Sequence, residues 1–177
     1  LQSMIKQLDM LEKAKAERLK RQIDSLLESL NALITQQQTQ LAALHKAVFQ
    51  NQMQKNEDDD PNKNQQPYKG LDTQLIKLNT NTYAVKDFAS KAGPKLAPAA
   101  TLIEQAAKAQ GNAIKALREN PVNSDTSIQN ETTSLNNLEK ARDIVEKLQK
   151  QIQKQENAQK KQELIKKYQL ILQQQLE

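Results

Sequence analysis

Apolar side chains recur once per helical turn along the first third of the chain, and no glycine or proline interrupts them. Their mean spacing is close to 3.6 residues, which is the period of a straight α-helix. The spacing predicts one helix over residues 3–53, with a face that packs in a bundle rather than in a tight two-stranded coiled coil. The stripe consists of Leu8, Leu11, Lys15, Leu19, Ile23, Leu26, Leu30, Leu33, Gln37, Leu41, Leu44 and Val48.

Two polar connectors divide the rest of the sequence. Residues 54–67 hold two prolines and no apolar side chain, so we expect a mobile acidic loop there. Residues 120–127 form the second connector and offer caps for a following helix. Between and after them, helical periodicity predicts three further helices, over residues 71–92, 98–119 and 128–176.

The composition favours an all-α fold. Three glycines and five prolines are too few for the many turns of a sandwich, a barrel or a nucleotide-binding sheet. Three arms of nearly equal length predict a single domain over residues 1–177, an elongated up-down-up helical bundle of four helices. In that bundle the first and last helices are parallel, and the middle arm is broken near Gly93-Pro94. The predicted register places this break beside Leu26–Leu33 and residue 154.

The sequence offers little material for catalysis. It has no cysteine and one histidine, which excludes thiol nucleophiles, disulfides and sites built on two histidines. Glycine-rich phosphate loops and Gly-x-Ser-x-Gly elbows are absent from it. We therefore expect a protein that is not an enzyme, with no catalytic residues, no cofactor and no metal site.

The acidic loop resembles the opening of an EF-hand calcium loop, because oxygen-bearing side chains alternate from Asp58 to Asn64. Lys63 stands where the sharp turn needs glycine, and Lys69 stands where a glutamate should bind the ion. Pro61 is a further departure. The interpretation we favour is an acidic linker that binds no metal.

Long amphipathic helices are typical of proteins that dock other helices. We expect a non-catalytic interaction or scaffold module whose partner is another protein or a second copy. The predicted docking residues are apolar positions left over from the bundle stripe: Leu27, Ile34, Leu170 and Leu172. The polar stretch 149–163 is interpreted as a solvent-rich waist, with a contact site as the alternative.

A second hypothesis follows from the net charge of +5. A basic face on the last helix would bind nucleic acid or an anionic membrane through Lys150, Lys154, Lys160, Lys161, Lys166 and Lys167. It is less favoured, because Tyr168 is the only aromatic side chain in that zone and residues 149–163 lack apolar membrane anchors. No apolar stretch is long enough for a transmembrane segment.

The composition also bears on the biological setting. A chain rich in Lys, Asn and Gln, without Cys or Trp, slightly favours a secreted or cell-surface bacterial protein. A secretion-system component, an effector or another virulence-associated structural protein would fit such a setting. The composition does not fix a compartment.

Overall fold

The computed structural model describes residues 1–55 and 63–176, and every regular element in those ranges is helical. The long helices are α1 (Gln2–Lys55), α2 (Leu71–Lys91), α3 (Ala97–Leu117) and α4 (Ser124–Leu176). Two short 3₁₀ helices, η1 (Lys63–Tyr68) and η2 (Pro94–Leu96), precede α2 and α3. The predicted all-α bundle of four helices is confirmed. Part of the predicted acidic loop is helical, because η1 covers its last residues.

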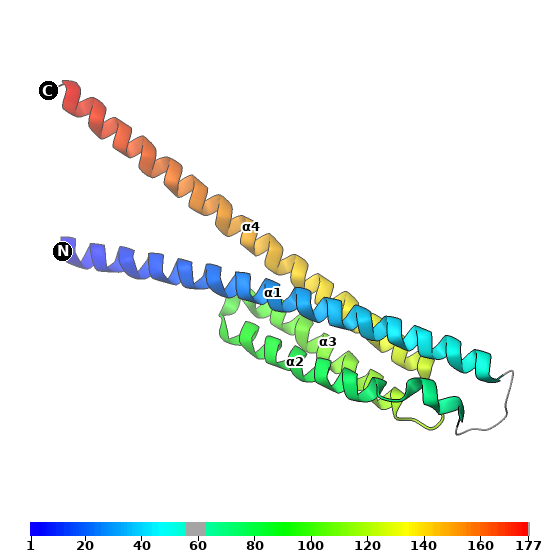
Figure 1. Cartoon of the computed structure of the whole chain (residues 1–177). Coiled ribbons are helices and arrows are strands. Elements are labelled where there is room, and N and C mark those ends of the chain that lie inside the picture. The colour runs from blue at the N-terminus through cyan, green and yellow to red at the C-terminus, as the bar shows by residue number, and fades with distance from the viewer. Residues whose placement is uncertain (56–62, 177) are drawn as a thin grey trace.

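The first and last helices are antiparallel, not parallel as predicted. Gln37 of α1 hydrogen-bonds Glu131 of α4, whereas Lys20 of α1 reaches Glu156. Residue numbers therefore fall along α1 as they rise along α4. The chain runs up, down, up and down (Figure 1).

The break at Gly93-Pro94 is a full reversal of the chain. The side chain of Asn79 on α2 donates to the carbonyl oxygen of Ala107 on α3, at 2.7 Å, so the two helices lie side by side. α2 and α3 thus form a hairpin about two fifths as long as α1 and α4 (Figure 1). The turn lies beside Lys15, Arg18, Leu19 and Gln22 of α1, further toward its N-terminus than the predicted level of Leu26–Leu33.

Gly93 makes the reversal possible because its backbone has φ 116° and ψ 177°, a region open almost only to glycine. Pro94 then begins η2 with the φ angle that a first helical position needs. A built Cβ at Gly93 would meet no atom within 4 Å, so only the backbone opposes substitution.

Two glycine-to-alanine changes should therefore have opposite effects. Gly93→Ala should lower the free energy of unfolding by about 1–3 kcal/mol, because alanine is strained at this φ. Gly111→Ala, in the middle of α3 and equally free of clashes, should raise it by about 0.5–1 kcal/mol. Urea unfolding followed by circular dichroism measures both, and a stabilised Gly93→Ala variant would contradict this account of the turn.

The core forms where all four helices lie together. α3 contributes small side chains that let its neighbours approach closely, among them Ala99, Ala106 and Ala113. Leucines of α1 and α2, such as Leu26, Leu30 and Leu75, fill the space between them. The apolar core therefore occupies only the part of the molecule spanned by the α2–α3 hairpin.

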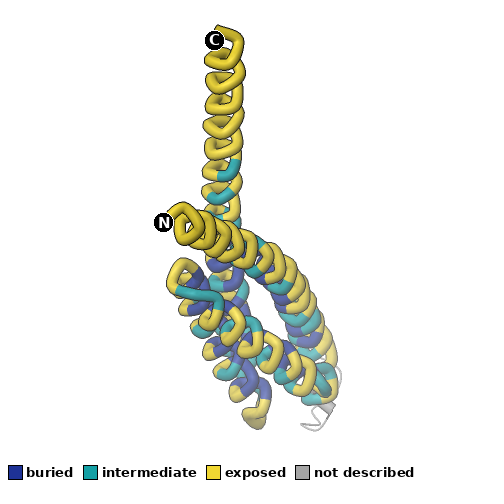
Figure 2. Tube along the Cα trace, turned by 90° about the vertical axis from the view of Figure 1, so that its left-hand side faces the viewer, coloured by how far each residue is buried: buried dark blue, intermediate teal, exposed yellow. Residues whose placement is uncertain are grey.

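Beyond the hairpin, α1 and α4 continue as two arms that leave the bundle at the same end and diverge (Figure 1). We call residues 1–18 of α1 the N-arm and residues 153–176 of α4 the C-arm. Every residue of the N-arm is exposed, and so is every residue of the C-arm except the half-buried Glu156 (Figure 2). The arms carry their side chains into solvent on all sides.

Candidate functional site

A layer of buried polar side chains crosses the bundle and joins all four helices. Gln110 of α3 donates from Nε2 to Gln37 of α1 and to Thr82 of α2, at 3.1 Å each. Gln37 in turn donates to the carboxylate of Glu131 on α4 at 3.2 Å, and its Oε1 accepts from Ser134 at 2.7 Å. Hydrogen bonds thus satisfy polar groups that would otherwise destabilise the interior.

Glu131 is the ionisable member of this layer, and its residue is 1% exposed. Burial raises the pKa of its carboxyl to about 7, while hydrogen bonds from Ser127 and Gln37 act in the opposite direction. The described residues that bond to it are neutral. A substrate cannot reach so enclosed a carboxyl without opening the bundle, which favours a structural role over a catalytic one.

The layer was only partly predictable. Gln37 falls on the stripe predicted for the first helix, but in the first half of α4 the buried Ser127 and Ser134 each lie one position before an apolar residue. Ser127 and Ser134 are buried, while Ile128 and Leu135 are only half-buried at the edge of the core. The available signal was the spacing of the polar residues: Ser127, Glu131 and Ser134 continue at three- and four-residue steps into Leu138, Ala141 and Val145.

The outer half of the N-arm carries an unpartnered apolar stripe. At 100° per residue, Leu1, Met4, Ile5, Leu8 and Leu11 fall within one third of the helix circumference. Each of these side chains is more than half exposed. On α1 this stripe continues the side of the helix that packs in the core at Ile23 and Leu26. That side is therefore buried within the bundle and exposed along the N-arm.

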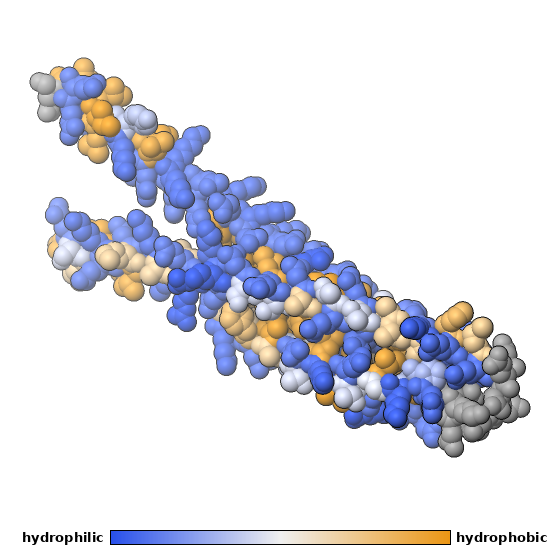
Figure 3. All heavy atoms as spheres, in the orientation of Figure 1, coloured by the Kyte–Doolittle hydropathy of each residue, from blue (hydrophilic) through white to orange (hydrophobic). Residues whose placement is uncertain are grey.

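The C-arm carries a second stripe, on a different side of its helix from the core. The core seam of α4, extended outward in steps of three and four residues, contains amides and one lysine: Gln155, Gln159, Gln162, Lys166, Gln169 and Gln173. Five exposed apolar residues lie away from this seam: Leu164, Ile165, Tyr168, Ile171 and Leu172. Leu176 is also exposed, but it lies on the seam, three residues beyond Gln173. Figure 3 shows apolar residues gathered toward the ends of both arms, with hydrophilic residues between them and the bundle.

The four predicted docking residues divide into two pairs. Leu27 and Ile34 are 9% and 4% exposed and belong to the core, so they are removed from the predicted docking surface. The sequence pattern placed them beside the main stripe, but contacts with several helices widen the buried face of α1. Leu170 and Leu172 are both 58% exposed on the C-arm, and Leu172 alone lies on its stripe.

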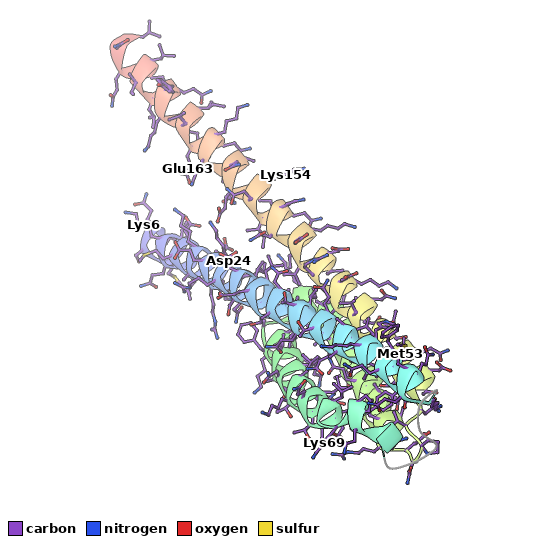
Figure 4. The ribbon with its side chains drawn as sticks, turned by 45° about the vertical axis from the view of Figure 1, so that its right-hand side comes forward. Lys6, Asp24, Met53, Lys69, Lys154 and Glu163 are labelled. Carbon is purple, nitrogen blue, oxygen red and sulfur yellow. The ribbon has the colours of Figure 1, made fainter. Side chains whose placement is uncertain are left out.

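The six predicted basic residues all lie exposed on the outer half of α4, but they do not form one face. Lys150, Lys154 and Lys161 share one side, whereas Lys160 and Lys167 turn to another and Lys166 to a third. Figure 4 shows Lys154 and Glu163 on the outer half of α4 and Asp24 on α1 near the point where the arms part.

The polar stretch 149–163 begins at that fork. Gln149 donates to Asp24 at 2.9 Å and Lys20 pairs with Glu156 at 3.3 Å, after which α4 leaves α1. A shallow groove remains between the helices, lined on α1 by Lys20, Ile23 and Asp24. The predicted waist is therefore the place where the bundle ends.

The candidate calcium loop falls largely on residues 56–62, which lie outside the described residues. Among the described residues, no group of three or more His, Cys, Asp or Glu side chains is placed to hold a metal ion. Within the same ranges, none of the helices combines the length and the hydropathy that crossing a membrane requires.

No protein-family model, curated protein or solved structure matches the chain. The two arms are therefore the candidate site on physical grounds, because they combine accessible apolar surface with an extended helical shape.

Proposed function

We propose that the chain is a non-catalytic helical interaction module that binds a protein partner through its N-arm and C-arm. The observation that carries this proposal is the pair of apolar stripes on two helices that no other described segment covers. Exposed apolar surface on a helix gains free energy when it packs against another apolar surface. A rigid bundle that holds two such helices apart suits a scaffold better than a catalyst.

A capture experiment tests this function. The immobilised chain is compared with Leu8→Asp/Leu172→Asp, which places a charge in each stripe, and with Phe49→Asp, which charges an exposed apolar residue at the far end of α1. The double variant should lose the captured partner while Phe49→Asp retains it. Identical capture by all three proteins, identified by mass spectrometry, would contradict a role for the arms.

The alternative is electrostatic binding of nucleic acid or an anionic membrane. It draws on the C-arm, where residues 153–176 hold five basic and two acidic side chains. Raising salt from 50 to 200 mM should weaken such a complex steeply, by about tenfold or more if several phosphates are contacted. Contacts between apolar helix faces should barely respond. Fluorescence anisotropy with labelled DNA, beside a vesicle flotation assay, separates the two functions.

The placement of such a module in a bacterial secretion system, effector or surface protein rests on composition and stays a prediction. Finding the captured partner in one of these assemblies would support it. The arms would serve equally in any assembly built from long helices.

A further inference from the structure

We propose that the partner of the arms is a second copy of this chain, bound tip to tip across a twofold axis. This inference rests on the proposed function and specifies its partner. In the arrangement, the N-arm of one copy lies antiparallel to the N-arm of the other, and the C-arms pair in the same way. The two bundles then lie at opposite ends of one rod.

The first argument is the number of helices. Four helices pass through the bundle, but α2 and α3 stop at the turn near Gly93, and only α1 and α4 continue among the described residues (Figure 1). The arms extend about 27 and 36 Å at 1.5 Å per residue. Two copies that overlap tip to tip would bring four helices together again, each copy supplying the two that the other lacks.

The second argument is the distance of the stripes from the fork, the point where α1 and α4 separate. Lys20 and Glu156 face each other at the fork. Leu11 lies nine residues further out along α1, and Leu164 lies eight residues further out along α4. The exposed apolar stripes begin at these two residues, after a polar segment of each arm next to the fork. A partner must therefore cover two apolar surfaces at nearly the same distance from the fork. A second copy fulfils this condition by symmetry, because its own stripes begin at the same distance.

The third argument is the direction of the stripes. The N-arm stripe continues the core-facing side of α1, whereas the C-arm stripe lies on the side of α4 away from its core seam. One helix inserted between the arms would cover the first and miss the second. A second copy supplies two helices, one for each stripe, and a twofold interface closes without leaving surface for further copies.

The fourth argument is area. The two stripes hold ten side chains that are 48–96% exposed. If each gives up about 70 Å² of apolar surface, the total is on the order of 700 Å² per copy, close to the roughly 800 Å² that each partner buries in a stable dimer of standard size. Both arms have a net positive charge, so added salt should leave the dimer unchanged or strengthen it.

Sedimentation velocity of the full chain over a wide concentration range tests the proposal. We expect a species of twice the 20.1 kDa chain mass, with the extended shape of a rod. Leu8→Asp and Leu172→Asp should each weaken the dimer by at least about tenfold, and the double variant should be a monomer. Phe49→Asp is the matched control and should dimerise like the wild type. Circular dichroism and thermal unfolding check that the variants keep the bundle.

A single cysteine gives an independent readout, because the chain has none of its own. Ile171→Cys lies near the middle of the C-arm stripe and should form a disulfide-linked dimer under mild oxidation. Met53→Cys, exposed at the opposite end of α1, should stay unlinked.

A wild-type chain that is monomeric at every concentration would overturn the second-copy proposal. So would open-ended oligomers, or a dimer that Phe49→Asp breaks and the arm variants do not. If the chain is monomeric but the arm variants still lose a captured protein, the dimer falls and the proposed function stands. If the arm variants alter neither self-association nor capture, both fall.

Discussion

The protein should lose stability as the pH rises from about 5 to 8, and Glu131→Gln should abolish that loss. The pKa of the Glu131 carboxyl is about 7 in the folded chain against 4.5 as its ordinary value. Between these values the folded state holds a proton that the unfolded state has released, so folding is favoured at low pH and the advantage disappears as pH passes 7. The total change should reach up to about 3 kcal/mol.

Glutamine keeps the shape of the side chain, and its carbonyl oxygen can still accept from Gln37. The variant should therefore be more stable than the wild type at pH 8 and should show a flatter pH profile. Urea unfolding at several pH values measures the difference. Glu163→Gln on the exposed C-arm is the control and should keep the profile of the wild type. Parallel profiles for wild type and Glu131→Gln would contradict the assignment.

The second large effect is expected from the core of α1. Leu30→Ala removes a fully buried side chain at the level where all four helices pack, and it should lower the free energy of unfolding by about 2–5 kcal/mol. Leu8→Ala makes the same chemical change on the same helix, where the side chain is 59% exposed, and should stay within about 0.5 kcal/mol of the wild type.

Denaturant unfolding of the two variants side by side, at a protein concentration low enough for the chain to be monomeric, measures this contrast. It tests whether the boundary between core and arm lies where the structure places it. Equal losses of stability in both variants would mean that the N-arm is packed in solution. Such a result in dilute protein would also exclude a free N-arm as the interaction surface of the monomer.

The helices could be predicted from the sequence because the periodicity along α1 and the connectors at 54–67 and 120–127 are local signals. The path of the chain could not. Glycine followed by proline ends a helix whether the chain bends or reverses, and equal lengths before and after the break suited both outcomes. Whether the chain bends or reverses depends on contacts between residues far apart in sequence, such as Asn79 with Gln110 and Gln37 with Glu131.

The candidate site was predicted in part for the same reason. Leu170 and Leu172 are exposed because α2 and α3 end early, and that shortening follows from the reversal at Gly93. With a straight middle arm, the outer halves of α1 and α4 would have been covered. Leu27 and Ile34 are buried because they lie at the level where the hairpin packs. The periodicity within one helix does not show where the hairpin ends, so it could not distinguish these buried residues from the exposed Leu172.

The polar layer has a further consequence for how the helices align along their common axis. Leucines and alanines pack almost as well after a helix slides by one turn, about 5.4 Å, since one apolar contact replaces another. Gln37, Gln110 and Glu131 do not permit such slippage, because each bonds to a group on a different helix at one height. A shifted helix would leave buried polar groups without hydrogen-bond partners, and each such group would destabilise the fold by about 1–3 kcal/mol. The layer therefore selects one axial alignment among several that the apolar packing alone would tolerate.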